Sequence, residues 1–255
     1  MNKIALITGA TSGIGRATAI KLAEIGIDVI ITGRRTRLIG ELEKEITTKT
    51  KSRALALSFD IRDNEAVIKS IDRLPSDWQN IDILVNNAGL AVGLDPINSG
   101  NIEDWEIMID TNLKGLLYIT RKIVPAMIGR KSGHIINIGS IAGKEVYPNG
   151  NVYCATKHAV DSLTKAMRID LLKYGIKVSQ IAPGMTETEF AKVRFNGDAM
   201  KAKQVYEGFE PLIAEDVAEA ILFAVTRPSH VNINDMVILA TNQANSIYTY
   251  KKTGE

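Results

Sequence analysis

A tyrosine and a lysine lie four residues apart in this chain, at Tyr153 and Lys157, and a serine, Ser140, follows the apolar segment 134–138. Four residues along a helix bring two side chains to the same face. A phenol has a reference pKa of about 10, and a neighbouring ammonium favours its ionised form. Lowering that pKa by about 2 units requires roughly 3 kcal/mol of differential interaction, which a close lysine and a bound cation together can supply. The spacing therefore predicts a tyrosine that exchanges a proton near neutral pH.

Apolar segments of strand length alternate along the chain with segments of helical periodicity. We expect strands at 3–8, 28–32, 53–59, 81–85, 134–139, 177–181 and 235–239, and helices at 14–25, 37–47, 63–73, 105–128, 152–173 and 214–226. This alternation predicts an α/β fold, a doubly wound parallel sheet with helices on both faces, in a single domain over 1–255. Segment 186–211 breaks the alternation and is long for a loop, which is typical of a lid over a binding site.

The composition is typical of a globular enzyme. The chain has 255 residues, of which 45% are hydrophobic and 24% charged, with a formal net charge of +2. No basic cluster and no membrane-length apolar run stands out, so we expect neither nucleic acid nor membrane as a partner. One cysteine, Cys154, and three histidines favour neither a disulfide nor a Cys/His metal site. The first apolar segment is expected to be a strand rather than a signal peptide, and the protein cytoplasmic.

A glycine-rich turn follows the first expected strand and precedes the first expected helix. The segment reads T-G-A-T-S-G-I-G, from Thr8 to Gly15. Glycines allow a tight turn and close approach of the backbone to a pyrophosphate at the N-terminus of the helix. The position at a strand–helix junction favours this interpretation over a purely structural turn. The predicted cofactor-binding residues of the turn are Gly9, Thr11, Ser12, Gly13, Ile14 and Gly15.

The end of the second expected strand carries two arginines, Arg34 and Arg35, and no carboxylate. Enzymes that select NAD usually place Asp or Glu here to hold the ribose 2′-hydroxyl, whereas arginine suits a phosphate. We therefore predict NADP as the cofactor; a solvated basic helix start is the alternative. Asp60 and Ile61 follow the third strand, where a carboxylate can accept a hydrogen bond from adenine.

The fourth expected strand ends in N-N-A-G, of which Asn87, Ala88 and Gly89 are predicted to contact the cofactor. Small residues permit close backbone approach, and the amides can join neighbouring strands. Together these motifs are specific enough to indicate a protein family. The chain resembles the short-chain dehydrogenase/reductase family over nearly its whole length, in Thr8–Gly15, Asn86–Gly89, Asn112, Ser140, Tyr153–Lys157 and Pro183-Gly184. The resemblance implies a Rossmann-type fold.

It also implies a role for each matching residue. Tyr153 would be the general acid/base, and Ser140 would hold the substrate oxygen against it. Lys157 would lower the pKa of the tyrosine and bind the nicotinamide ribose, and Asn112 would maintain a water for proton exchange with solvent. Tyr153 and Lys157 therefore count among the predicted cofactor contacts as well.

The segment that follows the sixth expected strand would shape the nicotinamide pocket. Four of its residues are predicted to do so: Pro183, Gly184, Thr186 and Thr188. The family often has Val or Ile where this chain has Thr186. Because that contact to the carboxamide is made by the backbone, only side-chain packing is affected.

Parts of the lid and of the C-terminal region are similar to a subgroup of the family, the NADP-dependent 3-hydroxy acid dehydrogenases that oxidise serine, allo-threonine and related short acids. Such a substrate carries a carboxylate and requires a cation near the pocket. Arg194, in the lid, is the candidate; pairing of Arg194 with an acidic lid residue is the alternative. The predicted substrate contacts are thus Ser140, Tyr153 and Arg194.

Two other functions remain open from the sequence. One is a reductase of another carbonyl class, such as ketones or 3-oxoacyl thioesters, and the other is a non-catalytic nucleotide-binding regulator. The long expected helices 105–128 and 152–173 have apolar residues on more than one face, which favours a homo-oligomer. The family resemblance implies a homotetramer. Cys154 and His158 are interpreted as packing or surface residues.

Overall fold

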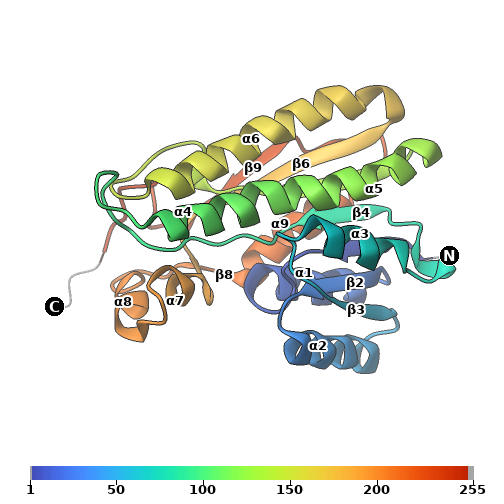
Figure 1. Cartoon of the computed structure of the whole chain (residues 1–255), viewed down its shortest axis with the longest axis horizontal. Helices are drawn as coiled ribbons and strands as arrows, with labels where there is room; N and C mark the ends of the chain where they lie inside the picture. Colours follow the sequence, from blue (N-terminus) through green and yellow to red (C-terminus); the bar gives the residue numbers. More distant parts are fainter. Residues whose placement is uncertain (1, 252–255) are drawn as a thin grey trace.

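The computed structural model describes residues 2–251, which form one seven-stranded parallel sheet with helices on both faces (Figure 1). The strand order is β3-β2-β1-β4-β5-β6-β9. The strands are β1 (Ile4–Ile7), β2 (Asp28–Gly33), β3 (Ala54–Ser58), β4 (Ile83–Asn86), β5 (Gly133–Ile138), β6 (Ile176–Pro183) and β9 (Asp235–Ile238). Each strand begins and ends within two residues of its predicted bounds. The predicted doubly wound sheet is confirmed, and its order reverses between β1 and β4.

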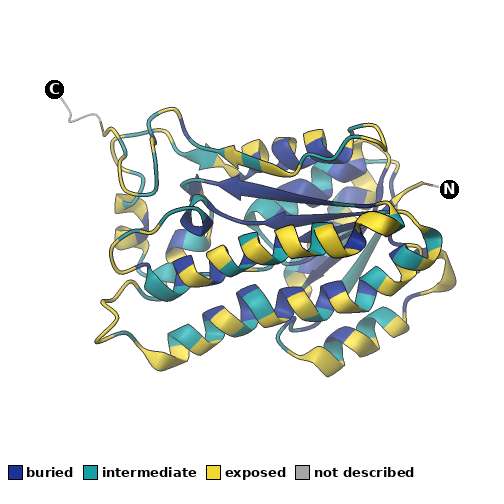
Figure 2. Cartoon of the chain, turned by 90° about the horizontal axis from the view of Figure 1, so that it is seen from above, coloured by how far each residue is buried: buried dark blue, intermediate teal, exposed yellow. Residues whose placement is uncertain are grey.

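Two helical layers cover the sheet. The helices are α1 (Gly13–Glu24), α2 (Thr36–Lys49) and α9 (Ala214–Val225) on one face, and α3 (Asn64–Asp72), α4 (Ile102–Ile109), α5 (Leu116–Arg130) and α6 (Asn151–Leu171) on the other. Ala5 and Ile7 of β1 pack in one apolar cluster, whereas Ile4 and Leu6 pack in the other. The central strands β1, β4, β5 and β6 are buried along almost their whole length, which explains their continuous apolar runs in the sequence (Figure 2). No helix in residues 2–251 has the length and apolar character to cross a bilayer.

The prediction of a single helix over 105–128 was wrong in one respect. It is divided into α4 and α5 by a π-helical segment, Asp110–Gly115, which contains Asn112. A π-turn adds a residue to the helix without changing the apolar pattern on either side, so periodicity alone does not reveal it. Such turns are frequent at functional sites because they redirect one side chain.

The segment 186–211 contains two short helices rather than an irregular loop. It begins with β7 (Thr186–Glu187), continues through α7 (Phe190–Arg194) and α8 (Ala199–Gln204), and leads into β8 (Leu212–Ile213). β7 and β8 pair in parallel as a separate two-stranded sheet. The Tyr206 hydroxyl donates a hydrogen bond to the Thr186 carbonyl across 2.9 Å, which closes the segment on itself. Short 3-10 helices at Ser76–Trp78, Ile141–Gly143 and Leu172–Tyr174 complete the described elements.

Candidate active site

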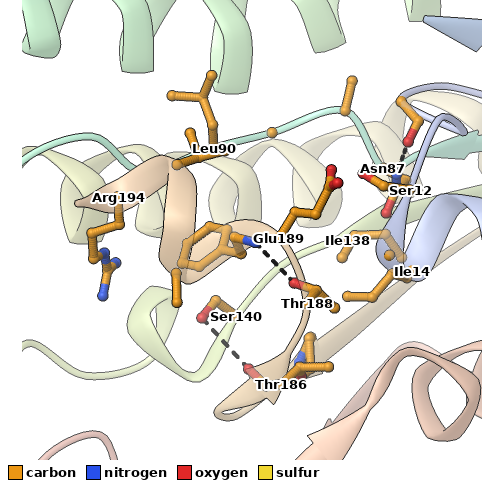
Figure 3. Close-up of a pocket in the computed structure, with 18 of the residues that line it drawn as sticks. Ser12, Ile14, Asn87, Leu90, Ile138, Ser140, Thr186, Thr188, Glu189 and Arg194 are labelled. Atoms are coloured by element: carbon orange, nitrogen blue, oxygen red, sulfur yellow. Dashed lines mark hydrogen bonds between the residues drawn. The ribbon is translucent and has the colours of Figure 1, made fainter. Parts of the chain in front are cut away.

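A cavity of about 620 Å³ opens at the carboxyl ends of the strands, over the point where the strand order reverses. Ligands of doubly wound sheets bind at this position. Figure 3 shows Arg194 and Ser140 toward one end of the pocket and Ser12, Ile14 and Asn87 toward the other. Most residues predicted from the sequence line this cavity, namely Gly9, Thr11, Ser12, Gly13, Ile14, Arg34, Arg35, Asp60, Ile61, Asn87, Ala88, Gly89, Ser140, Tyr153, Lys157, Pro183, Gly184, Thr186, Thr188 and Arg194.

The glycine-rich turn depends on its glycines in two ways. Gly9 and Gly13 adopt φ values of +67° and +53°, a region that favours glycine. Gly15 is in ordinary helical geometry, but a Cβ there would lie 2.4 Å from Asn87 Nδ2 and 2.6 Å from the Gly9 carbonyl oxygen. Asn87 Nδ2 donates to the carbonyl of Thr8 at 2.8 Å, so β4 is tied to the turn after β1. The turn thus borders the cavity at the start of α1.

The catalytic candidates come from two elements that follow one another in the chain. Ser140 lies at the end of β5, where its Oγ accepts a hydrogen bond from the Ala142 amide at 3.1 Å. Tyr153 and Lys157 lie one turn apart on α6 and are both buried. Lys157 Nζ donates to the Ile138 carbonyl at 2.9 Å and lies 5.9 Å from the centre of the Tyr153 ring. The predicted triad is therefore brought together around one end of the cavity.

The electrostatics of Tyr153 differ from the expectation. Burial raises the pKa of the Tyr153 phenol, whereas the positive charge of Arg194 and a hydrogen bond with Ser140 lower it. Burial also lowers the pKa of Lys157 to about 8. The sequence predicts that Lys157 and a bound cation together stabilise the phenolate. In the structure, the cation that lowers the pKa of this phenol is the guanidinium of Arg194, whose Cζ lies 5.1 Å from the centre of the ring.

Arg194 is enclosed by aromatic rings. Its Cζ lies 5.1 Å from the centre of the Tyr153 ring, 5.0 Å from that of Phe190 and 5.6 Å from that of Tyr147. Nη2 donates to the Tyr147 hydroxyl at 2.7 Å. Nε is buried and has no hydrogen-bond partner among residues 2–251. Contact with an aromatic cage, rather than an ion pair with an acidic lid residue, is the arrangement observed for this side chain.

Asn112 contacts the cavity wall through its neighbours. Its Oδ1 accepts from the Leu90 amide at 2.9 Å, and its Nδ2 donates to the Leu90 carbonyl at 2.9 Å and to Thr156 Oγ1 at 3.0 Å. The π-turn therefore aims this amide at the segment after β4 and at helix α6. Asn112 and Lys157 both lie beside Gly89. A Cβ built on Gly89 would be 3.2 Å from Asn112 Oδ1 and 3.6 Å from Lys157 Nζ.

The arginine end of the cavity is held by ion pairs. Arg35 lies 2.8 Å from the Glu189 carboxylate and donates to the hydroxyls of Thr11 and Ser12. Arg34 is more exposed and lies 3.8 Å from Asp60. Asp60 in turn accepts hydrogen bonds from the Arg62 guanidinium, so its carboxylate is already engaged by its own chain.

The residues that line the cavity but were not predicted from the sequence include Tyr147, Glu189, Gln243 and Ser246. Gln243 Oε1 accepts from the Met185 amide at 2.8 Å, and the Ser246 amide donates to the Glu145 carboxylate at 2.8 Å. The chain beyond β9 thus returns to form a wall of the pocket. Gln243 and Ser246 are isolated polar residues outside any periodic segment, so the sequence gives no signal for them.

Comparison with known proteins identifies relatives along the whole chain. Residues 3–199 match the family model for short chain dehydrogenases. An NADP-dependent 3-hydroxy acid dehydrogenase of Schizosaccharomyces pombe is 41% identical over 98% of this chain and 97% of its own length. Sulfoacetaldehyde reductase 2 of Chromohalobacter salexigens is 43% identical over 97% and 98%. The closed form of a serine dehydrogenase complexed with NADP⁺ superposes with a TM-score of 0.92, at 43% identity over 98% of this chain and all of that one.

Proposed function

The chain belongs to the short-chain dehydrogenase family, and we propose that it is an NADP-dependent oxidoreductase that interconverts short 3-hydroxy acids and their 3-oxo acids. Relatives named as NADP-dependent dehydrogenases support the cofactor and the reaction class. The choice of a 3-hydroxy acid depends on one observation, which is the half-buried Arg194 side chain beside Tyr153, whose buried Nε has no hydrogen-bond partner among residues 2–251.

The cavity fits a nicotinamide dinucleotide. It is within the size range of cofactor sites, and the glycine-rich turn lines it from Gly9 to Ile14. Arg34 and Arg35 lie at one end and offer cations to a phosphate, whereas Tyr153 and Lys157 lie at the other. When bound, NADP⁺ supplies the hydride acceptor for alcohol oxidation.

The protein's own residues then manage the substrate oxygen and its proton. Ser140 donates a hydrogen bond to the substrate oxygen and holds it near Tyr153. As the carbon–hydrogen bond breaks, the hydroxyl proton passes to the Tyr153 oxygen, and the substrate is left as a carbonyl. Arg194 and the hydrogen bond with Ser140 oppose the rise in the pKa of Tyr153 that burial causes, which favours the ionised phenol needed as a base. In the reverse direction the same phenol returns the proton.

Arg194 would recognise the substrate carboxylate. A guanidinium presents donors in a fork that matches the two oxygens of a carboxylate. Nη2 of Arg194 already donates to the Tyr147 hydroxyl, whereas Nε has no hydrogen-bond partner among the described residues. Because a buried donor without a partner is costly, a ligand oxygen there would restore the missing hydrogen bond. A carboxylate placed on Arg194 would also bring its β-carbon hydroxyl toward Tyr153.

The test is NADP⁺ reduction by Arg194→Met and wild-type protein, followed at 340 nm with serine, allo-threonine, 3-hydroxypropanoate and neutral alcohols of the same size. Loss of hydrogen bonds to a charged group is worth about 1.5–3 kcal/mol, so the KM for the acids should rise about ten- to 100-fold. The neutral alcohols should be affected much less. Lys192→Met is the matched control, because Lys192 is an exposed cation on the same short helix.

An unchanged KM for all three acids in Arg194→Met would contradict the carboxylate role. The NADP⁺ dissociation constant of each variant, measured by calorimetry, shows whether the cofactor site remains folded. A wild-type protein that oxidises neutral alcohols as well as the acids would instead favour another class of carbonyl substrate.

A sulfonate is a second candidate for the same cation. The relative of Chromohalobacter salexigens is named as a sulfoacetaldehyde reductase, and its identity with this chain equals that of the NADP⁺-bound structure. A sulfonate offers a third oxygen, which the unpartnered Nε of Arg194 can also bond. NADPH oxidation with sulfoacetaldehyde, set against 3-oxopropanoate, separates the two substrates by their ratio of kcat/KM.

We also propose that the enzyme is a homotetramer in the cytoplasm. Support for association comes from exposed apolar side chains on the long helices, such as Ile169 of α6 at 75% exposure and Leu117 of α5 at 41%. An exposed aliphatic side chain of this kind is usually covered by a partner when several lie on one surface. Light scattering after size-exclusion chromatography measures the assembly, and a monomer at micromolar concentration would contradict it.

A further inference from the structure

An ion pair joins the lid to the phosphate end of the cavity. Arg35, which precedes α2, donates from Nη1 to the Glu189 carboxylate at 2.8 Å, although the two residues are separated by 154 positions in the chain. Both side chains line the cavity. Glu189 is the residue immediately before α7, the helix that ends in Arg194. The pair thus connects the site predicted for the cofactor phosphate with the element that carries the substrate cation.

The Arg35 guanidinium is held in one pose by its other nitrogens. Nη2 donates to Thr11 Oγ1 and to Ser12 Oγ, both at 2.7 Å, and Nε donates to Thr11 Oγ1 at 3.2 Å. All three nitrogens are therefore engaged. Of these partners only Glu189 is charged, so it is the one that an incoming anion would replace or oppose. The hydroxyls keep the guanidinium pointed at the cavity whichever anion it meets.

Glu189 is itself stabilised as an anion. A hydrogen bond with Ser12 and the charge of Arg35 hold the pKa of its carboxyl below the ordinary value, despite partial burial. At neutral pH the position opposite Arg35 is therefore negatively charged. A phosphate monoester carries about −1.5 to −2 charges at pH 7, so it meets both an attractive arginine and a repulsive carboxylate at this place. A cofactor that lacks the 2′-phosphate is attracted less by Arg35 and repelled less by Glu189.

We propose that Glu189 occupies the phosphate position on Arg35 in the free enzyme, and that the 2′-phosphate of NADP displaces it. The consequence is that recognition of the phosphate releases the start of α7, which couples the adenine end of the cofactor to the lid and to Arg194. Glu189 thereby sets the strength of NADP binding relative to NAD. This inference depends on the proposed function, because it requires that Arg35 receives the cofactor phosphate.

The test is calorimetric binding without substrate, using NADP⁺, NAD⁺, adenosine 2′,5′-bisphosphate and 5′-AMP. Exposed ion pairs contribute up to about 1 kcal/mol, so Glu189→Gln should lower the dissociation constants of NADP⁺ and of the bisphosphate by about two- to five-fold. Those of NAD⁺ and 5′-AMP should stay within about two-fold. Glu187→Gln is the matched control, because Glu187 is an exposed carboxylate two residues away on β7.

A double-mutant cycle makes the assignment specific. In an Arg35→Gln background, Glu189→Gln should leave NADP⁺ binding unchanged, since the competition requires Arg35. Weaker binding of NADP⁺ and NAD⁺ alike in Glu189→Gln would overturn the inference, because it would make Glu189 a clamp over the bound cofactor. Unchanged binding would overturn it as well. A wild-type protein with equal affinity for NADP⁺ and NAD⁺ would instead refute the cofactor selection in the proposed function, and the inference with it.

Discussion

The two ends of the cavity are built differently. At the nucleotide end, the glycine-rich turn and the residues after β4 follow strands of the sheet, and Asn87 joins the two through the backbone carbonyls of Thr8 and Gly9. At the substrate end, Arg194, Tyr206 and Ser246 come from the lid and from the chain beyond β9, and are joined mainly through side chains. Under the proposed function, the sheet would position the cofactor and Tyr153, whereas segments outside the sheet would select the substrate. Changes at the two ends should consequently have separable effects.

The largest effect is expected from Tyr153→Phe. Removal of the proton-exchanging hydroxyl should lower kcat by about 10²- to 10⁴-fold, the usual contribution of general acid–base catalysis. NADP⁺ binding should change little, because the glycine-rich turn and the arginines remain. Stopped-flow turnover together with calorimetry of NADP⁺ measures both quantities. A loss of NADP⁺ affinity that matches the loss of kcat would mean that the two ends do not act separately.

Gly15→Ala tests the rigidity of the nucleotide end. The new methyl group would lie 2.4 Å from Asn87 Nδ2 and 2.6 Å from the Gly9 carbonyl oxygen. Both atoms belong to the segments that directly follow strands β4 and β1. Overpacking of this kind costs about 1–3 kcal/mol, so both the free energy of unfolding and NADP⁺ affinity should fall. Urea unfolding measures the free energy of unfolding, and calorimetry measures the dissociation constant of NADP⁺.

Gly40→Ala provides the control, since nothing lies within 4 Å of a Cβ at Gly40. Gly40 is inside helix α2, and alanine there should stabilise the protein by about 0.5–1 kcal/mol. Equal effects of the two substitutions would show that the turn adapts to a side chain, contrary to the view of a rigid nucleotide end.

These differences also explain how far the sequence could be interpreted. The strands, the glycine-rich turn and the Tyr153–Lys157 spacing are local patterns, and the structure brings the predicted residues together. The π-turn at Asn112 was missed because an added residue leaves the apolar pattern on either side intact. Gln243 and the Glu189–Arg35 pair were missed because they depend on tertiary folding, which brings together residues far apart in the sequence.

Between pH 6.5 and 5, a pH effect on global stability should come from the sheet, through His134 on β5. Burial, with the nearby charges of Lys177 and Lys3, lowers the pKa of His134 from 6.5 to about 3. The unfolded chain therefore binds a proton between pH 6.5 and about 3 that the folded chain does not, and stability falls as pH decreases through this window. The expected loss is about 2 kcal/mol between pH 6.5 and 5, at 1.36 kcal/mol per pH unit.

Urea unfolding of wild type and His134→Gln at several pH values measures this slope. The variant should lose it, and His158→Gln, on an exposed histidine of α6, should retain it. Because His134 lies on β5 and bonds Ser179 of β6 at 2.8 Å, the slope should be absent from proteolysis at the lid. The same slope in lid cleavage would mean that lid and sheet open as one unit.

The smallest effect is expected from Tyr206→Phe, which removes one hydrogen bond from the lid. The Tyr206 hydroxyl donates to the Thr186 carbonyl at 2.9 Å, and burial raises its pKa to about 12, so it is a neutral donor at working pH. Such a bond contributes about 0.5–1.5 kcal/mol, which predicts a two- to ten-fold faster cleavage of 186–211 by protease and a similar rise in the KM of the hydroxy acid.

The melting temperature and the NADP⁺ dissociation constant should stay near wild-type values in Tyr206→Phe, because the lid opens without unfolding the sheet. Tyr174→Phe, at the 3-10 helix after α6, is the matched control and should leave lid cleavage unchanged. If Tyr206→Phe lowered the melting temperature and weakened NADP⁺ binding together, the lid would unfold as one unit with the sheet and the nucleotide end of the cavity. Substrate selection would then be coupled to the stability of the whole domain, because every opening of the lid would also loosen the cofactor site.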